Sequence, residues 1–344
     1  MVDVPIIDVA PLVRGAGDTS IVASQIDTAC RAAGFFYVVG HGVDPQLQAR
    51  LDELSREFFA LPEHEKTEIA MARGGRAWRG WFPVGGELTS GIPDQKEGIY
   101  FGAELPADHP RVLAQTPLHG PNLVPRRPGV LREVALAYMD GMAQLGQAIL
   151  RGVALGLGVE PSFFVDHLTA DPLVLFRIFH YPPPPTLMVV GDRWGVGEHT
   201  DYGLRRSSPR TPTAGCRSVR LEAGWTPSRS GGFVCNLGDM LERLTGGLYR
   251  STPHRVRNAS GADRLSFPFF LDPSWDAVVG RLPIVERPPD QDGAERWDHT
   301  SVHGFAGTYG DYILGKVAKV FPDLAADSVA EAAHHLVHPP GLRQ

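Results

Sequence analysis

From Pro172 onward the chain breaks into short runs of β-forming residues separated by turns, and this pattern constrains the fold more than any other feature. The runs are Leu173 to Tyr181, Gly232 to Leu237, Leu248 to Ser251 and Arg264 to Leu271. Such lengths and spacings are typical of an antiparallel sandwich or barrel, whereas a parallel α/β sheet needs a helix between successive strands. The sequence therefore predicts a β core in the C-terminal half.

Three stretches ahead of this β core have the periodicity of amphipathic helices. The first follows a capping cluster at Asp18 and ends at Gly34, with apolar residues at helical spacing between them. The second begins at the cap and first-turn proline Asp44-Pro45, and the third covers roughly residues 129–155. A helical region is therefore expected before the β core.

Shorter elements complete the expected pattern. Strands are predicted at Val4–Val9 and Phe35–Val39. Residues 71–128 are rich in glycine and proline, which predicts a long irregular connection with short strands near residues 99–101. A last helix is predicted at Tyr309–Val320, packed on the outside of the β core.

We divide the chain into four parts on this basis. They are an N-terminal helical and mixed region at 1–125, a long buttressing helix at 126–170, the β core at 171–285 and a C-terminal helical extension at 286–344. With 344 residues, 43% of them hydrophobic, the chain can bury a sizeable shared core. No internal repeat or linker separates the parts, so we expect the helices to support one β core.

The charge pattern narrows the possible partners. Lys and Arg number 33 against 39 Asp and Glu, so the net charge is 33 − 39 = −6, which does not favour nucleic acid. No basic leader precedes an apolar stretch, and no 18-residue apolar run occurs, so we expect a cytoplasmic monomer or weak oligomer without a membrane partner. Three scattered cysteines, Cys30, Cys216 and Cys235, fit a reducing compartment.

A possible metal site lies at His199 and Asp201. Residues two apart in a strand point to the same side, so an imidazole and a carboxylate could face one ion. His254 follows another predicted strand and could return across a β sandwich as a third ligand. Two histidines and one carboxylate are the ligands of non-haem Fe(II) oxygenases, although the same set could hold Zn²⁺, and His-x-Asp can also be a surface turn.

A second polar pair lies on a predicted strand. Arg264 and Ser266 fall on one strand face, while Leu265, Phe267 and Phe269 fall on the other. An arginine that faces inward needs an anionic partner, because a buried unpaired charge is costly. The guanidinium and hydroxyl suit a bound carboxylate, and a structural salt bridge to an internal Asp or Glu is the alternative.

Six motifs in order resemble the isopenicillin N synthase-like 2-oxoglutarate/Fe(II) dioxygenases. They are Ala33 to Val43, Phe176 to Pro183, Gly197 to Leu204, Cys235 to Met240, Tyr249 to Val256 and Arg264 to Ser266. Each motif alone is weak, but six in order over most of the chain are specific. The resemblance implies a double-stranded β-helix, or jelly roll, behind a helical N-terminal region.

The resemblance also implies roles for individual residues. His199, Asp201 and His254 would bind Fe(II), and Arg264 and Ser266 would hold the distal carboxylate of the co-substrate 2-oxoglutarate. By the same resemblance Tyr181 would line the co-substrate pocket. Apart from the resemblance, Tyr202 is a substrate-side candidate because it lies next to the metal pair, and Phe270 could line a pocket or belong to the core. Many members have Asn near the position of His180, so this chain departs from the pattern there.

The chemistry implied by the family is oxidative. O₂ and 2-oxoglutarate are consumed, succinate and CO₂ are released, and hydrogen is removed from a small-molecule substrate. Related halogenases have a small residue in place of the carboxylate ligand, so Asp201 favours hydroxylation, desaturation or cyclisation. An oxidase independent of 2-oxoglutarate, as in isopenicillin N synthase, and a catalytically dead remnant are the alternatives. A zinc hydrolase would leave Arg264 and Ser266 without a purpose.

Residues 205–230 depart most from the family pattern. An apolar strand, a turn and a Gly-Gly-Leu-Gln-Val type strand are expected after Asp201, but this segment is rich in arginine and proline. The residues concerned are Arg205, Arg206, Arg210, Arg217, Arg220 and Arg229, with Pro209, Pro212 and Pro227. We expect that such a segment suits neither a strand nor a core.

A shift of reading frame explains this segment. If residues 205–218 are encoded by one suitable set of G/C-rich codons, the same bases read one frame over give Thr-Ile-Leu-Ala-Gln-Asp-Pro-Asn-Gly-Gly-Leu-Gln-Val. The frame would then be regained at Gly231. Our hypothesis is that two compensating single-base insertions or deletions, real or introduced in sequencing, scrambled residues 205–230. The alternative is an inserted Arg/Pro loop on the surface.

Overall fold

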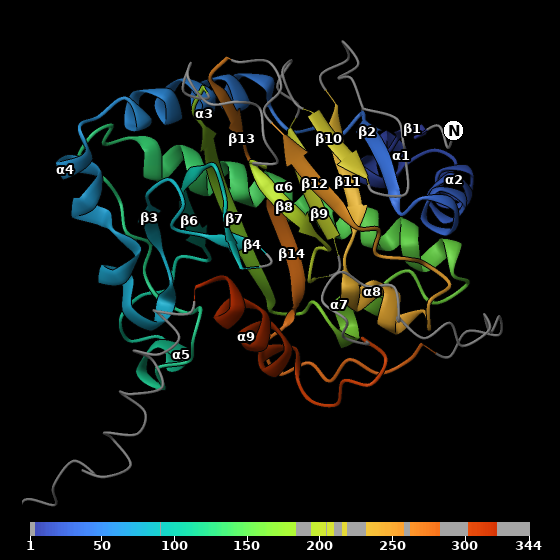
Figure 1. The fold of residues 1–344 in the computed structure, drawn as a ribbon. Coiled ribbons are helices and arrows are strands. Elements are labelled where there is room, and N and C mark those ends of the chain that lie inside the picture. The colour runs from blue at the N-terminus through green and yellow to red at the C-terminus, as the bar shows by residue number, and fades with distance from the viewer. Residues whose placement is uncertain are drawn as a thin grey trace, which may run out of the picture.

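Figure 1 shows the fold of the chain in a computed structural model. The structure describes residues 4–89, 91–183, 194–203, 205–209, 215–218, 232–257, 262–282 and 302–321. For residues 205–209, 215–218 and Arg257 it describes the backbone only.

Caps and apolar spacing form the N-terminal helices as predicted. Asp18 caps α2 (Thr19–Ala32) and Asp44 caps α3 (Pro45–Phe59), each by accepting hydrogen bonds from first-turn amides. The remaining elements of this region are β1 (Ile6–Asp8), α1 (Ala10–Arg14), β2 (Phe35–Val39), α4 (Glu63–Lys66) and two 3-10 helices at Thr67–Ile69 and Met71–Ala77.

The connection at residues 71–128 contains more strand than we predicted. Besides β6 (Glu97–Gly102), which covers the expected strand, it forms β3 (Gly80–Phe82) and a hairpin, followed by a short helix. The hairpin is β4 (Leu88–Thr89) with β5 (Ile92–Pro93), and the helix is α5 (Pro110–Leu113). Strands of two or three residues are too short for an alternating pattern to be recognised in sequence.

A single long helix supports the β core from behind (Figure 1). Helix α6 (Leu131–Gly156) contacts α1, α2 and α3, and it also contacts β14 (Phe269–Ser274) of the sheet. At Gly146 a Cβ atom would lie 2.7 Å from the Leu271 side chain, so glycine allows the helix to approach the sheet. The short helix α7 (Phe163–His167) follows and leads into the sheet.

Two sheets form a jelly roll, as the sequence predicted. The larger sheet has the strand order β1-β2-β11-β9-β14-β7-β6-β3 with β13 paired to β7, and the smaller has the order β10-β12-β8. The remaining strands are β7 (Pro172–Tyr181), β8 (Val196–His199), β9 (Arg205–Pro209), β10 (Gly215–Ser218), β11 (Phe233–Leu237), β12 (His254–Arg257) and β13 (Arg264–Ser266). From β7 to β13 consecutive strands alternate between the two sheets, which is the winding of a double-stranded β-helix.

Two strand predictions in the β core were wrong in detail. Leu248 to Ser251 forms no strand, because it follows the turn after α8 (Asp239–Leu244); its Tyr249 is buried and donates a 2.6 Å hydrogen bond to Asp27. The run from Arg264 to Leu271 divides into β13 and β14 around Pro268, which cannot donate a ladder hydrogen bond.

The prediction that residues 205–230 suit no strand was also wrong for part of their backbone. Strand β9 pairs with β11 and β14 inside the larger sheet, and β10 pairs with β12 in the smaller one. These residues form strands despite their composition because of their position in the chain: β9 and β10 continue the alternation of consecutive strands between the two sheets. The rest of the segment, apart from these strands, lies outside the described residues.

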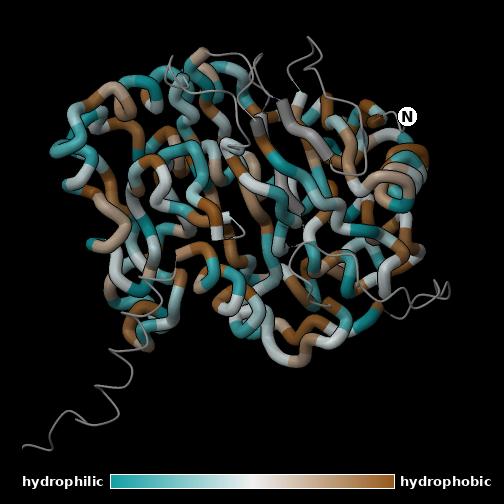
Figure 2. The backbone as a smooth tube through the Cα atoms, viewed as in Figure 1, coloured by the Kyte–Doolittle hydropathy of each residue, from teal (hydrophilic) through white to brown (hydrophobic). Residues whose placement is uncertain are grey.

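Burial follows the hydrophobic pattern of the elements. Hydrophobic and hydrophilic residues alternate over short distances along the tube in Figure 2, as expected of elements buried on one side. One cluster of buried apolar residues joins the N-terminal helices, both sheets and α9 (Tyr309–Val320), which matches the predicted C-terminal helix. Of the helices in the described ranges, none combines the length and apolarity needed to cross a bilayer.

Candidate metal and co-substrate site

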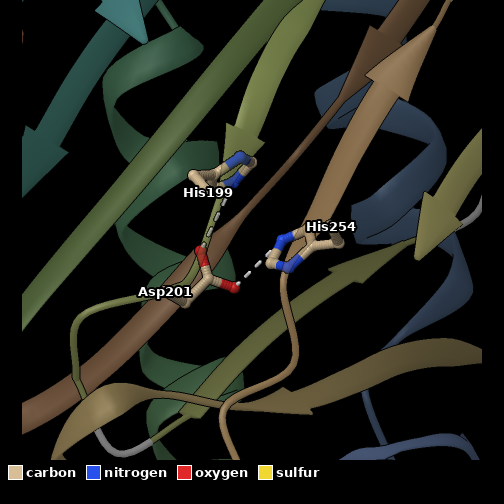
Figure 3. Close-up of side chains that lie close together, drawn as sticks. All are labelled: His199, Asp201 and His254. Carbon is tan, nitrogen blue, oxygen red and sulfur yellow. Dashed lines mark ion pairs between the residues drawn. The ribbon is translucent and has the colours of Figure 1, made fainter. Parts of the chain in front are cut away.

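Neighbouring strands of the smaller sheet bring the three predicted metal ligands together (Figure 3). His199 is the last residue of β8 and pairs with His254, the first residue of β12, while Asp201 follows β8 by two residues. The Nε2 atoms of His199 and His254 lie 3.8 and 3.6 Å from the two carboxylate oxygens of Asp201. One ligand atom from each residue lies within 4.8 Å of the others.

Hydrogen bonds orient both imidazoles for metal binding. Nδ1 of His199 lies 2.8 Å from the Gly197 carbonyl oxygen, and Nδ1 of His254 lies 3.1 Å from that of Thr252. A carbonyl oxygen only accepts, so Nδ1 carries the proton in each ring and Nε2 keeps its lone pair. These lone pairs and the carboxylate form a two-nitrogen, one-oxygen donor set that fits Fe(II).

The carboxylate of Asp201 has a supporting residue that we did not predict. Asn236 on β11 donates a hydrogen bond from Nδ2 to Oδ2 of Asp201, and both side chains are buried. Asn236 lies within the Cys235 to Met240 motif, so its position was visible in sequence, but its contact with Asp201 depends on sheet pairing. Such partners of metal ligands hold their orientation.

The residues expected to bind 2-oxoglutarate also come together. Strand β13 pairs with the end of β7, so Arg264 lies opposite Tyr181 and Ser266 lies opposite Phe179. The Arg264 guanidinium lies 4.6 Å from the centre of the Tyr181 ring, and Ser266 Oγ lies 3.4 Å from the Tyr181 hydroxyl. Arg264, Ser266 and Tyr181 are all buried, so the structure places a cation and two hydroxyls in one interior group.

His180, whose role the sequence left open, bridges two acidic residues. Its Nδ1 lies 2.8 Å from Glu97 on β6, and its Nε2 contacts Asp263, the residue before Arg264. Burial alone lowers the pKa of His180, but hydrogen bonds to Glu97 and Asp263 outweigh burial and raise the pKa above its ordinary value. His180 therefore ties β7 to β6 and to the start of β13.

A cavity of about 300 Å³ opens beside the metal triad. Its lining comes from β6, β7, β8 and β14, from the β4–β5 hairpin and from α9, so α9 covers the cavity. Tyr202 and Phe270, the two predicted substrate-side residues, both line it together with His199 and Asp201. Arg264, Ser266 and Tyr181 lie outside this lining. A cavity of this size suits a small organic molecule.

Buried charges surround the cavity. Lys96 contacts Asp94 and lies 2.9 Å from a carboxylate oxygen of Glu87, while Arg177 on β7 lies over the rings of Tyr100 and Phe270. Burial lowers the pKa of Lys96, but the carboxylates of Glu87 and Asp94 outweigh burial and raise it. The lining is thus largely apolar with a few fixed charges, and apart from Asp201 the sequence singled out none of them.

Burial also shifts the pKa of Asp272, an acidic residue of the cavity lining. Asp272 on β14 accepts a 2.6 Å hydrogen bond from the Tyr309 hydroxyl and is almost fully buried. Burial raises the pKa of Asp272 to about 7, although the hydrogen bond from Tyr309 opposes the shift.

Comparisons with known proteins agree with this geometry. The family model described as 2OG-Fe(II) oxygenase superfamily matches residues 172–273, and that described as non-haem dioxygenase in morphine synthesis N-terminal matches residues 4–127. A Dictyostelium discoideum protein named probable iron/ascorbate oxidoreductase is 44% identical over 330 residues, covering 88% of this chain and 90% of that protein.

Two further proteins are similar over nearly the whole chain. A homoarginine-6-hydroxylase of Arabidopsis thaliana is 34% identical, with 92% of this chain and 97% of that protein covered. The crystal structure of a full-length Neurospora crassa protein in complex with alpha-KG shares the fold, with a TM-score of 0.73 and 22% identity over 92% of this chain and 96% of that one.

Proposed function

Because this chain belongs to the 2-oxoglutarate/Fe(II) oxygenase superfamily, whose members are non-haem iron oxidoreductases, we propose that it oxidises a small organic molecule with 2-oxoglutarate and O₂. The proposed reaction is hydroxylation, desaturation or cyclisation, with succinate and CO₂ as the other products. The observation that carries the proposal is the group of His199, Asp201 and His254 beside a cavity of about 300 Å³.

We assign the metal to this triad. The two Nε2 lone pairs and the Asp201 carboxylate would hold Fe(II), and the Asn236 amide would keep the carboxylate in place. Bound iron supplies the redox chemistry that couples O₂ to decarboxylation of 2-oxoglutarate and oxidation of the substrate. His199 and Asp201 line the cavity, so a substrate bound in the cavity would lie beside the metal.

The assignment of Arg264, Ser266 and Tyr181 to 2-oxoglutarate rests on their chemistry. A buried guanidinium with a neighbouring hydroxyl suits the distal carboxylate of a dicarboxylic acid. The pairing of β13 with β7 holds both groups on rigid strands, which favours a fixed orientation of the bound acid.

Tyr202 and Phe270 are the proposed substrate-side residues. Both line the cavity next to the triad, and apolar residues such as Val196 and Val317 would exclude water from the reacting centre. The name of the Arabidopsis relative, homoarginine-6-hydroxylase, supports hydroxylation of a small molecule as the reaction type.

The proposal is tested by O₂ uptake and succinate release from purified protein loaded with Fe(II). We expect turnover to require both Fe(II) and 2-oxoglutarate, and a chelator to abolish it. Substrate-dependent O₂ uptake without 2-oxoglutarate would instead support an oxidase of the isopenicillin N synthase type. Failure of the folded protein to bind metal would support the dead remnant.

A further inference from the structure

Arg177 is a cation of the cavity that the proposed mechanism leaves without a role. It lies on β7 and lines the cavity together with His199 and Asp201. Aromatic rings contact its faces: its guanidinium carbon is 4.0 Å from the centre of Tyr100 and 4.9 Å from that of Phe270. The nearby carboxylates of Glu87 and Asp272 favour its charged form, but among the residues that the structure describes, no carboxylate oxygen lies within 4.0 Å of its guanidinium nitrogens.

The two buried lysines of the lining, unlike Arg177, form ion pairs with acidic side chains. Lys96 contacts Glu87 and Asp94, and Lys316 lies 3.8 Å from Asp239. Arg177 makes no side-chain hydrogen bond to any described residue, and its Nε is shut off from solvent. Aromatic rings interact with the faces of a guanidinium but leave its in-plane N–H groups without acceptors.

The sheet places two guanidinium groups in one row. Arg177, Phe179 and Tyr181 alternate along β7 and share a face, and Arg264 lies opposite Tyr181 on that same face. Four residues of strand separate positions 177 and 181 by about 13 Å. With one arginine at each end, this row could bind two anionic ligands at once. 2-Oxoglutarate would be the ligand of Arg264, which leaves Arg177 for a second anion.

We propose that Arg177 binds the carboxylate of the substrate, so that the substrate is a small carboxylic acid. The planar fork of the guanidinium fits a carboxylate through paired charge-assisted hydrogen bonds. The body of the acid lies against the apolar part of the lining, which includes Leu175 and Val317, and its oxidised carbon faces the metal triad. This inference rests on the proposed oxygenase function.

Binding of matched acids and amides tests the assignment without turnover. The protein is loaded with Mn(II), which accepts the same nitrogen and oxygen ligands, and with 2-oxoglutarate. Short straight-chain acids, aromatic acids and amino acids, each paired with its primary amide, are then titrated by calorimetry. We expect acids to bind and their amides to bind about tenfold or more weakly, because each amide lacks the charge that Arg177 recognises.

Substitutions of Arg177 test whether this residue causes the preference for acids over amides. Arg177→Gln should abolish the difference between acid and amide, and Arg177→Lys should retain part of it. Arg126→Gln is the matched control, because the Arg126 side chain is 86% exposed; it should keep the full difference. An acid preference that survives Arg177→Gln, equal binding of amides, or no binding of any acid would overturn the proposal.

Arg264→Gln separates the two anion sites. We expect it to raise the dissociation constant for 2-oxoglutarate about tenfold or more, whereas Arg177→Gln should change that constant far less. A larger effect of Arg177→Gln on 2-oxoglutarate would assign Arg177 to the co-substrate and overturn the inference. If the wild-type protein binds neither Mn(II) nor 2-oxoglutarate, the result contradicts the oxygenase function itself and not only the role of Arg177.

Discussion

Single residues around the cavity hold its charges in place without touching a reacting atom. Asn236 fixes the Asp201 carboxylate, and Lys96 is buried between Glu87 and Asp94. Asn236 reaches Asp201 through the packing of distant strands, whereas Asp94 lies two residues from Lys96 in the chain. We therefore expect substitution of Asn236 to change the metal affinity and substitution of Lys96 to change the stability of the fold.

Asn236→Ala should lower the affinity for Fe(II) by about 10- to 100-fold, because the carboxylate of Asp201 loses its orienting hydrogen bond. Metal titration of the folded variant measures this effect, and His254→Ala serves as the reference for loss of a ligand. An unchanged metal affinity in Asn236→Ala would show that the sheet alone orients Asp201.

Lys96→Met should destabilise the protein by about 3–5 kcal/mol, because it leaves the carboxylates of Glu87 and Asp94 buried without their cation. Urea unfolding measures the change in the free energy of unfolding. Lys319→Met is the matched control, since Lys319 is exposed at the end of α9. A loss in Lys96→Met no larger than in this control would contradict the prediction.

At the scale of elements, β7 joins the group of Arg264, Ser266 and Tyr181 to the cavity. It pairs with β6 on one side and with β13 and β14 on the other. Arg177 and Tyr181 lie on one face of this strand and His180 on the opposite face. The N-terminal region reaches it through α3: the Phe59 ring stacks on His180, and Arg56 pairs with Asp263. His180 is therefore the point where this region is joined to the strand that bears Arg264.

The stabilisation by His180 should depend on pH. Its folded-state pKa is raised above 6.5, so protonated His180 contributes its full stability below that pH, and the contribution is lost as pH rises through the folded-state pKa. The charged groups facing it are Glu97 and Asp263, with Lys66 on Glu97 and Arg56 on Asp263.

Urea unfolding of wild type and His180→Gln at several pH values measures this contribution. We expect a difference of about 1–3 kcal/mol below pH 6.5 that shrinks in alkaline solution. A difference that stays constant, or grows with pH, would mean that the neutral ring makes the stabilising contacts.

On the scale of the whole molecule, the winding of the jelly roll requires strands at the positions of β9 and β10. Strand β9 covers residues 205–209 and β10 covers residues 215–218, and the frame-shifted translation puts its apolar runs Thr-Ile-Leu-Ala-Gln and Gly-Leu-Gln-Val at about these positions. The printed β9, Arg-Arg-Ser-Ser-Pro, has no apolar residue for either face of a sheet. The strand positions are thus consistent with the frame-shift hypothesis.

Peptide mass mapping across Leu204 to Phe233, with a protease that does not cut at arginine, tests that hypothesis. We expect masses of the Thr-Ile-Leu-Ala-Gln type sequence, which would describe an oxygenase with an intact sheet. Masses of the printed, arginine-rich sequence would contradict the hypothesis. In that case we expect little activity, because a stability of about 5–15 kcal/mol is small against the loss of apolar contacts in a central strand.

The sequence alone indicated the helices with clear caps and a β core, and the resemblance of its motifs indicated the jelly roll and the proposed metal ligands. Asp18 and Asp44 act on their own first turns, and His199 and Asp201 are two residues apart, so local geometry is sufficient for them. Short strands such as β3, and the loop at Leu248 to Ser251, were predicted incorrectly because local preference is weak there and pairing or packing decides.

Only the tertiary structure decided which distant side chains share the cavity. Arg177 lines the cavity and Asn236 supports Asp201 through partners that packing brings to them. Lys96 has Asp94 two residues away, but only the packed structure shows that both are buried. Whether a charged side chain is a surface residue, an internal ion pair or a ligand-binding group depends on its burial and on its neighbours in space. Those are properties of the packed sheets, and a linear pattern of residues does not contain them.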